Sequence, residues 1–506
     1  MFSMYFYAGL TAAVSHTTPS GAAAAAECAS WTGPQPGYIA VHQVGASLFN
    51  VSLLQCRQHC DATPACQSVD YSPLEVADHA NGSRCNLRDC SAGDGAGCAL
   101  HANSPSLGQH FNSYTCDQRH TPGNPTPAPA PPGVHVLPAA DAKVDWAGRR
   151  AADGATGAVS FDWLGVSARV EVVGASYVRV NVSGTQARGT RMRAYGEQQG
   201  FLLYPTVQLW VERDPAFALH TLWAGAIDRR HSFAVTLENI VAPQYGTGIT
   251  TVHAFVTDGE FVAVPDAKRF GGAPGGGGRR IEFIGDSITA ATNVVRPPGA
   301  PTCGDGGYQS DWSQTYEAQL CHRFGASCST IAVGGKCVMR ECGGLQMPDY
   351  FTGLYYKDGA TPTYDFGAGG SGWKPDAMFI DLGTNDAGRI ARMGSPAGPD
   401  AFIAETLAFM VNATAKYAKP DIVFFLNAGP MENVTMPWTV EAIAQANARG
   451  LNATFVNMTT ACWASDEHGA GNSDFCDGCA SHPGIQGHRN MYEAAWPVMA
   501  QVMGWE

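Results

Sequence analysis

The sequence predicts a multidomain chain in which a cysteine-rich module, an all-β sandwich and a three-layer α/β/α domain follow one another. First, its 506 residues are about three times the ~150 residues of a common domain, which excludes a single small domain. Second, the cysteines fall into two groups of eight, at 28–116 and 303–479. Third, alternating apolar runs before residue 264 give way to apolar strands separated by helices after residue 279.

Composition narrows the class of partner. Apolar residues make up 45% and charged residues 15% of the chain, which is typical of a folded protein. No hydrophobic run approaches the ~20 apolar residues of a membrane-spanning helix. The formal net charge of -13 opposes nucleic acid or an anionic membrane as the main partner, because both require a basic surface. We therefore expect a neutral ligand, no nucleic acid and no transmembrane segment.

Cysteine usage and the first residues indicate a secreted, extracellular protein. Sixteen cysteines in two even groups are typical of disulfide-bonded domains in an oxidising compartment. Residues 1–26 hold an apolar stretch at 4–14 and an alanine-rich run before Glu27, which predicts a signal peptide, although no Lys or Arg precedes the stretch. The alternative is a truncated or wrongly assigned start. Candidate glycosylation sequons stand at Asn50, Asn81, Asn181, Asn412, Asn433, Asn452 and Asn457.

Two linkers divide the chain. Residues 122–132 form a Pro-Ala tract that should stay extended, and residues 271–278 form a glycine-rich run without the Lys-Ser/Thr ending of a phosphate-binding loop. Between them, period-two runs such as YVRVNVSG and VQLWVER predict an antiparallel sandwich. The predicted domains are a cysteine-rich module at 27–118, a Pro-rich linker at 119–133, a β-sandwich at 134–270, a Gly-rich linker at 271–279 and an α/β domain at 280–506.

After residue 279, the pattern predicts a parallel sheet covered by helices on both faces. Strands are predicted at 281–285, 329–333, 376–383, 421–427 and 453–457. Helices are predicted at 311–324, at 400–417 with Asp400 as the cap, and at 439–449. Sites in such sheets form at the carboxyl ends of the strands, so candidate residues are sought there.

Residues suited to acyl transfer follow three of these strands. Ser287, in a GDS triplet, comes just past the first strand, where its hydroxyl can act as a nucleophile, although the triplet alone favours an ordinary turn. Gly335 follows the second strand, and Asn385, in GTND, follows the third; a backbone N–H and an amide are the donors that an oxyanion needs. His482 precedes the last predicted helix, with Pro483 in its first turn, and can serve as the general base.

These four blocks resemble the SGNH or GDSL-type hydrolases, esterases and lipases with a flavodoxin-like three-layer fold, over about residues 280–506. The resemblance implies that Ser287 is the nucleophile and His482 the base. It also implies an oxyanion hole made by Ser287, Gly335 and Asn385. The GTND block is unchanged, whereas the usual Ser-Gly pair of the second block reads Gly-Gly. The preceding sandwich, with its DWLG and YVRVNVSG stretches, resembles family-2 carbohydrate esterases, which join a small jelly-roll to this fold and deacetylate plant-type polysaccharides.

The third member of the catalytic triad departs from the family. An Asp normally stands two or three residues before the histidine, where this sequence has Ala480 and Cys479. Asp477, five residues before His482, is the tentative third member if a disulfide bends the intervening loop. The alternative is a Ser287–His482 dyad in which a backbone carbonyl accepts the Nδ1 proton. An inactive enzyme is the remaining alternative.

A dense group of potential metal ligands lies in the same region. Only one pair has the CxxC spacing of a zinc site, and disulfide pairing is favoured in an oxidising compartment. We therefore expect no metal and no organic cofactor, with zinc as the minor alternative. The residues are Cys462, Cys476, Cys479, His468, His482 and His488.

The first cysteine group, in which Cys56, Cys60 and Cys66 precede Cys85, resembles the PAN or apple module. The resemblance implies an α+β module with a cysteine-bearing helix, for which residues 52–60 are suited. Its function would be to bind a glycan or a protein; the alternative is a stability domain without a ligand. The pairing of its disulfides cannot be read from the sequence.

Together these observations predict a secreted serine esterase that removes O-acetyl groups from a polysaccharide. Two alternatives stay open. One is a non-catalytic glycan- or protein-binding protein on a hydrolase scaffold. The other is a lipase-like esterase for longer acyl chains.

Overall fold

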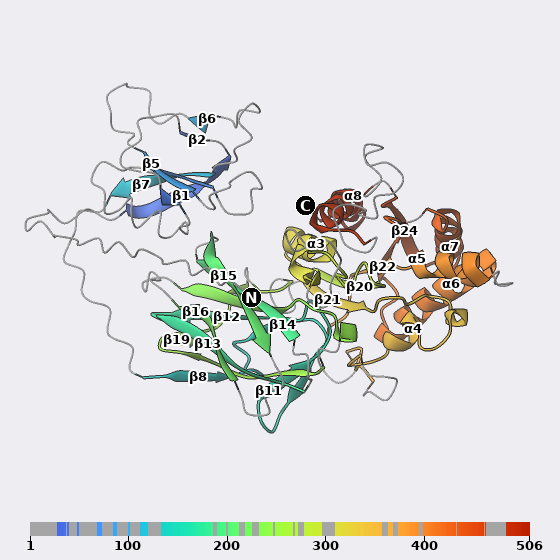
Figure 1. The fold of residues 1–506 in the computed structure, drawn as a ribbon, viewed down its shortest axis with the longest axis horizontal. Coiled ribbons are helices and arrows are strands. Elements are labelled where there is room, and N and C mark those ends of the chain that lie inside the picture. Colours follow the sequence, from blue (N-terminus) through green and yellow to red (C-terminus); the bar gives the residue numbers. More distant parts are fainter. Residues whose placement is uncertain are drawn as a thin grey trace, which may run out of the picture. The chain divides into compact units, whose positions relative to one another are not determined.

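The computed structural model divides the chain into two compact units, Met1–Pro127 and Ala128–Glu506 (Figure 1). From residue 133 to 505 it describes the chain apart from residues 186–189, 199–200, 212–217, 225–231, 246–247, 267–268, 272–277, 296–308, 357–362, 368–372, 394–397, 432, 460 and 462–481. Before residue 133 it describes only strand backbone: β1 (Cys28–Pro36), β2 (Tyr38–Ile39), β3 (Leu48–Phe49), β4 (Ser68–Ser72), β5 (Arg84–Arg88), β6 (Leu100–His101) and β7 (Asn112–Arg119).

The strands of the first unit pair antiparallel, in the order β1-β7-β4-β5-β3, with β2 paired to β6. The predicted signal peptide at 1–26, the predicted helix at 52–60 and the side chains of the first cysteine group lie outside the described residues. The apple-like module therefore stays a prediction.

The second unit begins with two antiparallel sheets. One has the order β10-β11-β18-β13-β16 with β8 on β18, and the other has the order β15-β14-β17-β12-β19 with β9 on β12. Their strands are β8 (His135–Pro138), β9 (Asp145–Ala147), β10 (Ala151–Asp153), β11 (Ala158–Phe161), β12 (Ser167–Val173), β13 (Tyr177–Gly184), β14 (Thr190–Gln198), β15 (Phe201–Val211), β16 (Ala218–Ala224), β17 (Phe233–Asn239), β18 (Thr250–Thr257) and β19 (Glu260–Val262).

The alternation that predicts these strands matches their burial. On β13 the buried residues are Val178, Val180 and Val182, and the residues between them are partly exposed. Successive side chains of a strand point to opposite faces, so one face of β13 packs in the core. The predicted antiparallel strands are confirmed, while the jelly-roll topology stays a prediction.

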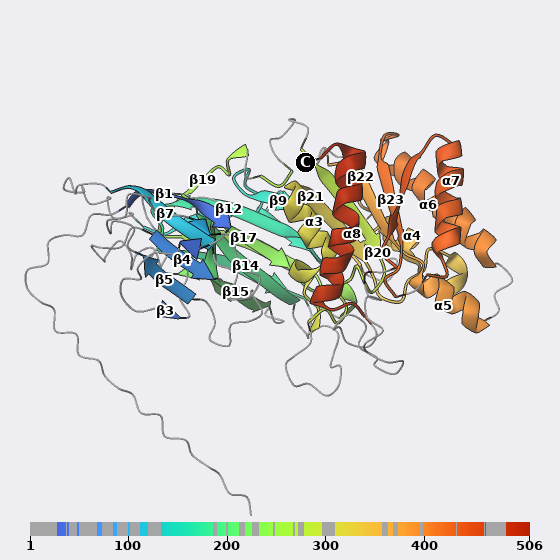
Figure 2. The same ribbon diagram turned by 90° about the horizontal axis from the view of Figure 1, so that it is seen from above.

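The second half of this unit is a parallel sheet in the order β21-β20-β22-β23-β24, the flavodoxin-like order 2-1-3-4-5. Its strands are β20 (Arg280–Gly285), β21 (Ser327–Ala332), β22 (Ala377–Asp381), β23 (Val423–Ala428) and β24 (Asn452–Asn457). Around them lie η3 (Trp312–Gln314), α3 (Tyr316–Phe324), η4 (Arg340–Cys342), α4 (Met347–Tyr350), α5 (Thr384–Met393), α6 (Gly398–Tyr417), α7 (Met436–Ala448) and α8 (Ile485–Met503). Figure 2 shows α3 and α8 on one side of the sheet and α6 and α7 on the other.

The predicted helix starts differ from the observed ones. The helix predicted at 439–449 begins at Met436. Asp311 caps the short η3, and α3 begins only at Tyr316, because the hydroxyl of Thr315 accepts a hydrogen bond from the next turn. Asp400 is not a cap but lies in the first turn of α6, where its charge still suits the helix dipole. Pro483 precedes α8 instead of lying in its first turn.

The antiparallel and parallel sheets share one hydrophobic core. Leu164 and Ile240 of the first half pack in the same buried cluster as Ile281 and Phe283 of β20. A continuous core disfavours relative motion between the two halves. Within the part of the chain that the structure describes, no helix is long and apolar enough to span a membrane.

Candidate active site

Ser287 lies just past the end of β20, the strand between β21 and β22 in the sheet. A Cβ at Gly285 would collide with the side chain of Thr289, so only glycine permits this tight exit from the strand. The carbonyl of Ser287 accepts a hydrogen bond from the N–H of Thr292 at 3.0 Å. These contacts hold the serine at the carboxyl end of the sheet, where such folds bind ligands.

His482 lies 195 residues from Ser287 in the sequence and beside it in the fold. Its Nε2 lies 2.8 Å from the Oγ of Ser287, and both residues are half-buried. If Nε2 is unprotonated, the hydroxyl donates to it, which is the arrangement that a general base and its nucleophile require. The residue predicted as base is therefore within hydrogen-bond reach of the residue predicted as nucleophile.

Gly335 belongs to the segment that follows β21, residues 333–342, which we name the oxyanion loop after the role predicted for Gly335 from the sequence. Gly335 is exposed and has a φ of 74°, a backbone conformation that favours glycine. Asn385, in the first turn of α5, reaches this loop: its Nδ2 donates to the carbonyl of Lys336 at 3.2 Å and to Oδ2 of Asp286 at 2.9 Å. Asn385 thus connects the loop after β20 to the oxyanion loop.

The oxyanion loop is held by a residue to which the sequence analysis gave no role. Asp386 is fully buried, and its two carboxylate oxygens accept hydrogen bonds from the N–H groups of Val338 and Met339 at 3.2 and 2.9 Å. A disulfide between Cys337 and Cys342 closes the same loop. Two residues of the GTND motif, Asn385 and Asp386, therefore hold the loop by hydrogen bonds.

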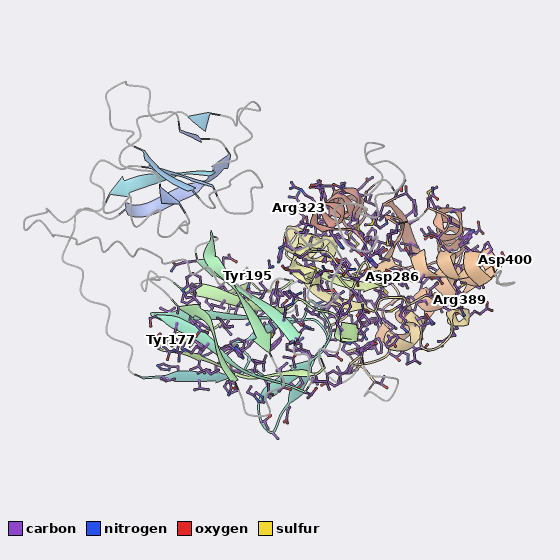
Figure 3. The ribbon with its side chains drawn as sticks, viewed as in Figure 1. Tyr177, Tyr195, Asp286, Arg323, Arg389 and Asp400 are labelled. Atoms are coloured by element: carbon purple, nitrogen blue, oxygen red, sulfur yellow. A yellow bond between two sulfur atoms is a disulfide. The ribbon has the colours of Figure 1, made fainter. Side chains whose placement is uncertain are left out.

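Two buried acidic residues, Asp286 and Asp381, lie at the strand ends near Ser287. Asp286 accepts from the N–H of Ile288 at 2.9 Å, and Figure 3 labels it among the side chains of the parallel-sheet half. Burial, followed by the charge of Asp381, raises the pKa of Asp286 well above its ordinary value. Asp381, at the end of β22, accepts from Thr289 at 3.0 Å and from Asn427 at 2.7 Å. Asp381 within the apolar run at 376–383 is a sequence signal for these hydrogen bonds, because a buried carboxyl needs partners.

His488, one of the potential metal ligands, is buried in α8 instead of facing an open site. Its Nδ1 accepts from the N–H of Tyr316 at 3.4 Å, and its ring is stacked on that tyrosine. Burial and the nearby His482 lower the pKa of His488 to about 3, so the ring is neutral at physiological pH.

Other predicted residues of this region lie outside the described residues. They are Asp477, Cys462, Cys476, Cys479 and His468. The group that orients the other nitrogen of His482 therefore stays a prediction.

One further cluster within the described residues has metal-ligand composition, formed by Cys337, Cys342 and Asp386. Because the two cysteines are joined in a disulfide, they offer no thiolate to a metal. A second disulfide, Cys321–Cys328, joins α3 to β21.

The glycosylation candidates differ in exposure. Asn433, Asn452 and Asn457 are exposed, whereas Asn181 and Asn412 are half-buried. The side-chain oxygen of Asn181 is buried on β13. Asn50 and Asn81 lie outside the described residues.

Comparison with protein families identifies the parallel-sheet half. Residues 283–489 match the GDSL-like Lipase/Acylhydrolase family. This GDSL-type acylhydrolase domain covers about two fifths of the chain and contains Ser287, Asn385 and His482. The chain thus carries a carboxylic ester hydrolase domain. A search of curated proteins finds no match.

The similarity to solved structures extends beyond the acylhydrolase domain into the rest of the chain. A family two carbohydrate esterase from Cellvibrio japonicus is 17% identical with a TM-score of 0.58, and the match covers 74% of this chain and 99% of that one. An acetyl xylan esterase from the rumen bacterium Butyrivibrio proteoclasticus is 18% identical with a TM-score of 0.57, covering 74% and 100%. A family 2 carbohydrate esterase with a carbohydrate-binding domain from Corynascus thermopiles is 25% identical with a TM-score of 0.52, covering 72% and 100%. The predicted SGNH-type hydrolase fold is confirmed.

Proposed function

We propose that the chain is a serine esterase that removes O-acetyl groups from a polysaccharide. The observation that carries the proposal is the 2.8 Å contact between Oγ of Ser287 and Nε2 of His482 within an acylhydrolase domain. The similarity to a family 2 carbohydrate esterase at 25% identity favours an acetylated polysaccharide as the substrate. The net charge of -13 is compatible with a neutral polymer.

In the proposed reaction, Oγ of Ser287 attacks the acetyl carbonyl carbon and His482 takes the hydroxyl proton at Nε2. The carbonyl oxygen becomes an oxyanion, for which the N–H groups of Ser287 and Gly335 and the amide of Asn385 are the proposed donors. His482 then returns the proton to the departing sugar oxygen. Water, activated by the same imidazole, hydrolyses the acetyl-enzyme and releases acetate.

Asn385 has both amide protons engaged, by Asp286 at 2.9 Å and by the carbonyl of Lys336 at 3.2 Å. To serve the oxyanion it would exchange one of these partners. The contact to Lys336 is the longer one, and a hydrogen bond to a developing negative charge is stronger than one to a neutral carbonyl, so this is the contact that the oxyanion would replace.

The test is the hydrolysis of 4-nitrophenyl acetate by Ser287→Ala and His482→Ala variants. We expect kcat to fall by about 10³-fold or more in each, because the nucleophile and its base act as a unit. His322→Ala is the matched control, since the side chain of His322 is 56% exposed on α3. Full activity in Ser287→Ala would exclude the mechanism. Inert wild-type protein that still binds glycans would favour the non-catalytic alternative.

The acyl chain and the polymer are tested separately. Acetyl, butyryl and octanoyl esters of 4-nitrophenol distinguish the proposed esterase from a lipase-like one, which would prefer the longest chain. Acetate release from acetylated xylan, glucomannan and pectin then compares polysaccharides.

The group that orients His482 is tested by Asp477→Ala. If this variant retains the full rate, the orienting group is a backbone carbonyl instead of that carboxylate.

We also propose that the enzyme is secreted and works outside the cell. Sixteen cysteines, and disulfides such as Cys321–Cys328 in the described part of the chain, support an oxidising compartment. Expression of the full chain with an epitope tag at its C-terminus tests this, and we expect the protein in the medium with residues 1–26 removed.

A further inference from the structure

The segment η1 (Pro243–Tyr245) comes from the antiparallel half of the second unit, between β17 and β18, yet it contacts two loops of the acylhydrolase site. The Oε1 atom of Gln244 accepts a hydrogen bond from the backbone N–H of Gly334. The hydroxyl of Tyr245 is hydrogen-bonded to the hydroxyl of Thr292. One contact therefore reaches the oxyanion loop, and the other reaches the loop that begins with Ser287.

In the oxyanion loop, the residues on either side of Gly335 are anchored by hydrogen bonds, whereas no protein group in the described part of the chain anchors the N–H of Gly335 itself. Beyond it along the chain, Asn385 holds the carbonyl of Lys336, and Gln346 accepts from the N–H of Cys337 at 2.8 Å. Before it, Gln244 holds the N–H of Gly334. Between these anchors stands the N–H of Gly335, which donates to no protein group in the described residues.

We propose that Gln244 is a positioning residue of the oxyanion hole, an inference that rests on the proposed function. Gln244 fixes the peptide that joins Val333 to Gly334, the unit directly before the one that carries the Gly335 N–H, and so restricts the directions in which that N–H can point. Glycine pairs have wide conformational freedom, so this peptide needs an external anchor to keep one orientation. An oxyanion donor is effective because it is oriented before the charge develops.

The remaining anchors explain why the loss of Gln244 should affect rate more than stability. The rest of the oxyanion loop is held by Asp386, which accepts from the N–H groups of Val338 and Met339, and by the Cys337–Cys342 disulfide. The Ser287–His482 contact does not involve Gln244. Removal of the Gln244 acceptor therefore leaves the nucleophile and its base in place and frees a single donor to reorient.

The variant that tests the proposal is Gln244→Met, which keeps a side chain of similar length without an amide oxygen. Gln244→Asn is the second variant, since it keeps an amide that is too short to reach Gly334. Gln445→Met is the matched control, because Gln445 donates to Glu441 at 2.9 Å in an exposed contact within α7. Each full-length variant is assayed with 4-nitrophenyl acetate.

We expect kcat of both Gln244 variants to fall about tenfold or more, with KM changed by less than about threefold, since the lost interaction acts in the transition state. Inhibition by phenylboronic acid, whose tetrahedral adduct on serine mimics the intermediate, should weaken by a similar factor. The melting temperatures of the Gln244 variants should stay at the wild-type value. The Gln445→Met control should match wild type in kcat, KM and melting temperature.

Two results would overturn the inference. One is a kcat within about twofold of wild type in both Gln244 variants. The other is a loss of kcat that follows a lower melting temperature while phenylboronic acid inhibition is unchanged, which would indicate a structural role only. Ser287→Ala separates the two proposals: if that variant is inactive and the Gln244 variants are normal, only this inference fails. If Ser287→Ala is active, the proposed function fails first.

Discussion

Arg149 and Glu282 form a fully buried ion pair, with 3.0 Å between the guanidinium Nη2 and the carboxylate Oε1. Arg149 comes from the antiparallel half of the second unit and Glu282 from β20 of the parallel sheet. The pair is also well hydrogen-bonded: Tyr417 donates to Glu282 at 2.8 Å, and Arg149 donates to the carbonyl of Gly353 at 3.1 Å. Such partners are required to keep two charges out of water.

Arg149→Met should destabilise the protein by about 3–5 kcal/mol, because it leaves the carboxylate of Glu282 buried without its cation. Chemical denaturation followed by tryptophan fluorescence measures the change. The matched control is Arg340→Ala, which breaks an ion pair with Asp349 in which the arginine is 57% exposed. Its cost should stay below about 1 kcal/mol. Equal effects of the two substitutions would contradict the role of burial.

Asp162 predicts a pH dependence of stability. Burial raises the pKa of Asp162 to about 7, against the opposing hydrogen bond from the N–H of Tyr356. The unfolded value is about 3.9, so the folded state binds an extra proton between about pH 4 and pH 7, and stability is lost as pH rises through that window. Asp162→Asn cannot ionise and should gain melting temperature relative to wild type across the same window. A difference that is constant with pH would contradict this prediction.

Asp153 is the control, because its effect on stability is expected to change with pH in the opposite direction to that of Asp162. Hydrogen bonds from Thr156 and Ala155 lower the pKa of this exposed carboxyl. Its contribution to stability is therefore present above the unfolded pKa and lost as pH falls. Relative to wild type, Asp153→Asn should lose melting temperature at neutral pH and recover it in acid, by a small amount because the group is exposed.

The parts of the fold that could be predicted are those in which local pattern and burial agree. The parallel strands were found within two residues because apolar runs such as 281–285 are buried on both faces. The helix starts could not be predicted as closely, because they depend on caps such as Thr315, whose side-chain hydrogen bonds are not encoded in the hydrophobic pattern. The short α5 was missed for a related reason: its first turn is the polar GTND motif, which also fits an Asx turn.

The site shows the same division. Ser287, Asn385 and His482 could be named because they stand in short motifs with known chemistry. Gln244 could not, since a single polar residue between β17 and β18 carries no sequence signal and acquires its contact with Gly334 only when the sheets pack. Asp386 was part of a recognised motif, but its grip on Val338 and Met339 follows from tertiary structure.

The Cys337–Cys342 disulfide should support catalysis through the oxyanion loop. Replacing both cysteines by serine removes the covalent closure two residues from Gly335. We expect kcat on 4-nitrophenyl acetate to fall about tenfold, since one oriented donor loses its support. The equivalent replacement at Cys321 and Cys328, which joins α3 to β21, should lower the melting temperature while leaving kcat near wild type. Unchanged kcat in the first variant would show that the hydrogen bonds to the loop, such as those of Asp386, hold it without the disulfide.

The contact between Asp286 and Asn385 allows stability and catalysis to be separated. In Asp286→Asn, one amide N–H group must face either Nδ2 of Asn385 or the N–H of Ile288, whichever way the new amide is turned. A buried donor without an acceptor costs about 1–3 kcal/mol, so the melting temperature and kcat should both fall.

The double variant Asp286→Asn with Asn385→Asp restores the pair in reverse, with the amide now on residue 286. We expect the melting temperature to recover in part, because donor and acceptor match again between residues 286 and 385, whereas a carboxylate at 385 cannot donate to the carbonyl of Lys336. We expect kcat to remain about 10²-fold below wild type, since a carboxylate at position 385 cannot donate to an oxyanion and places a negative charge beside it. Recovery of kcat together with stability would show that Asn385 orients the loops without serving the oxyanion.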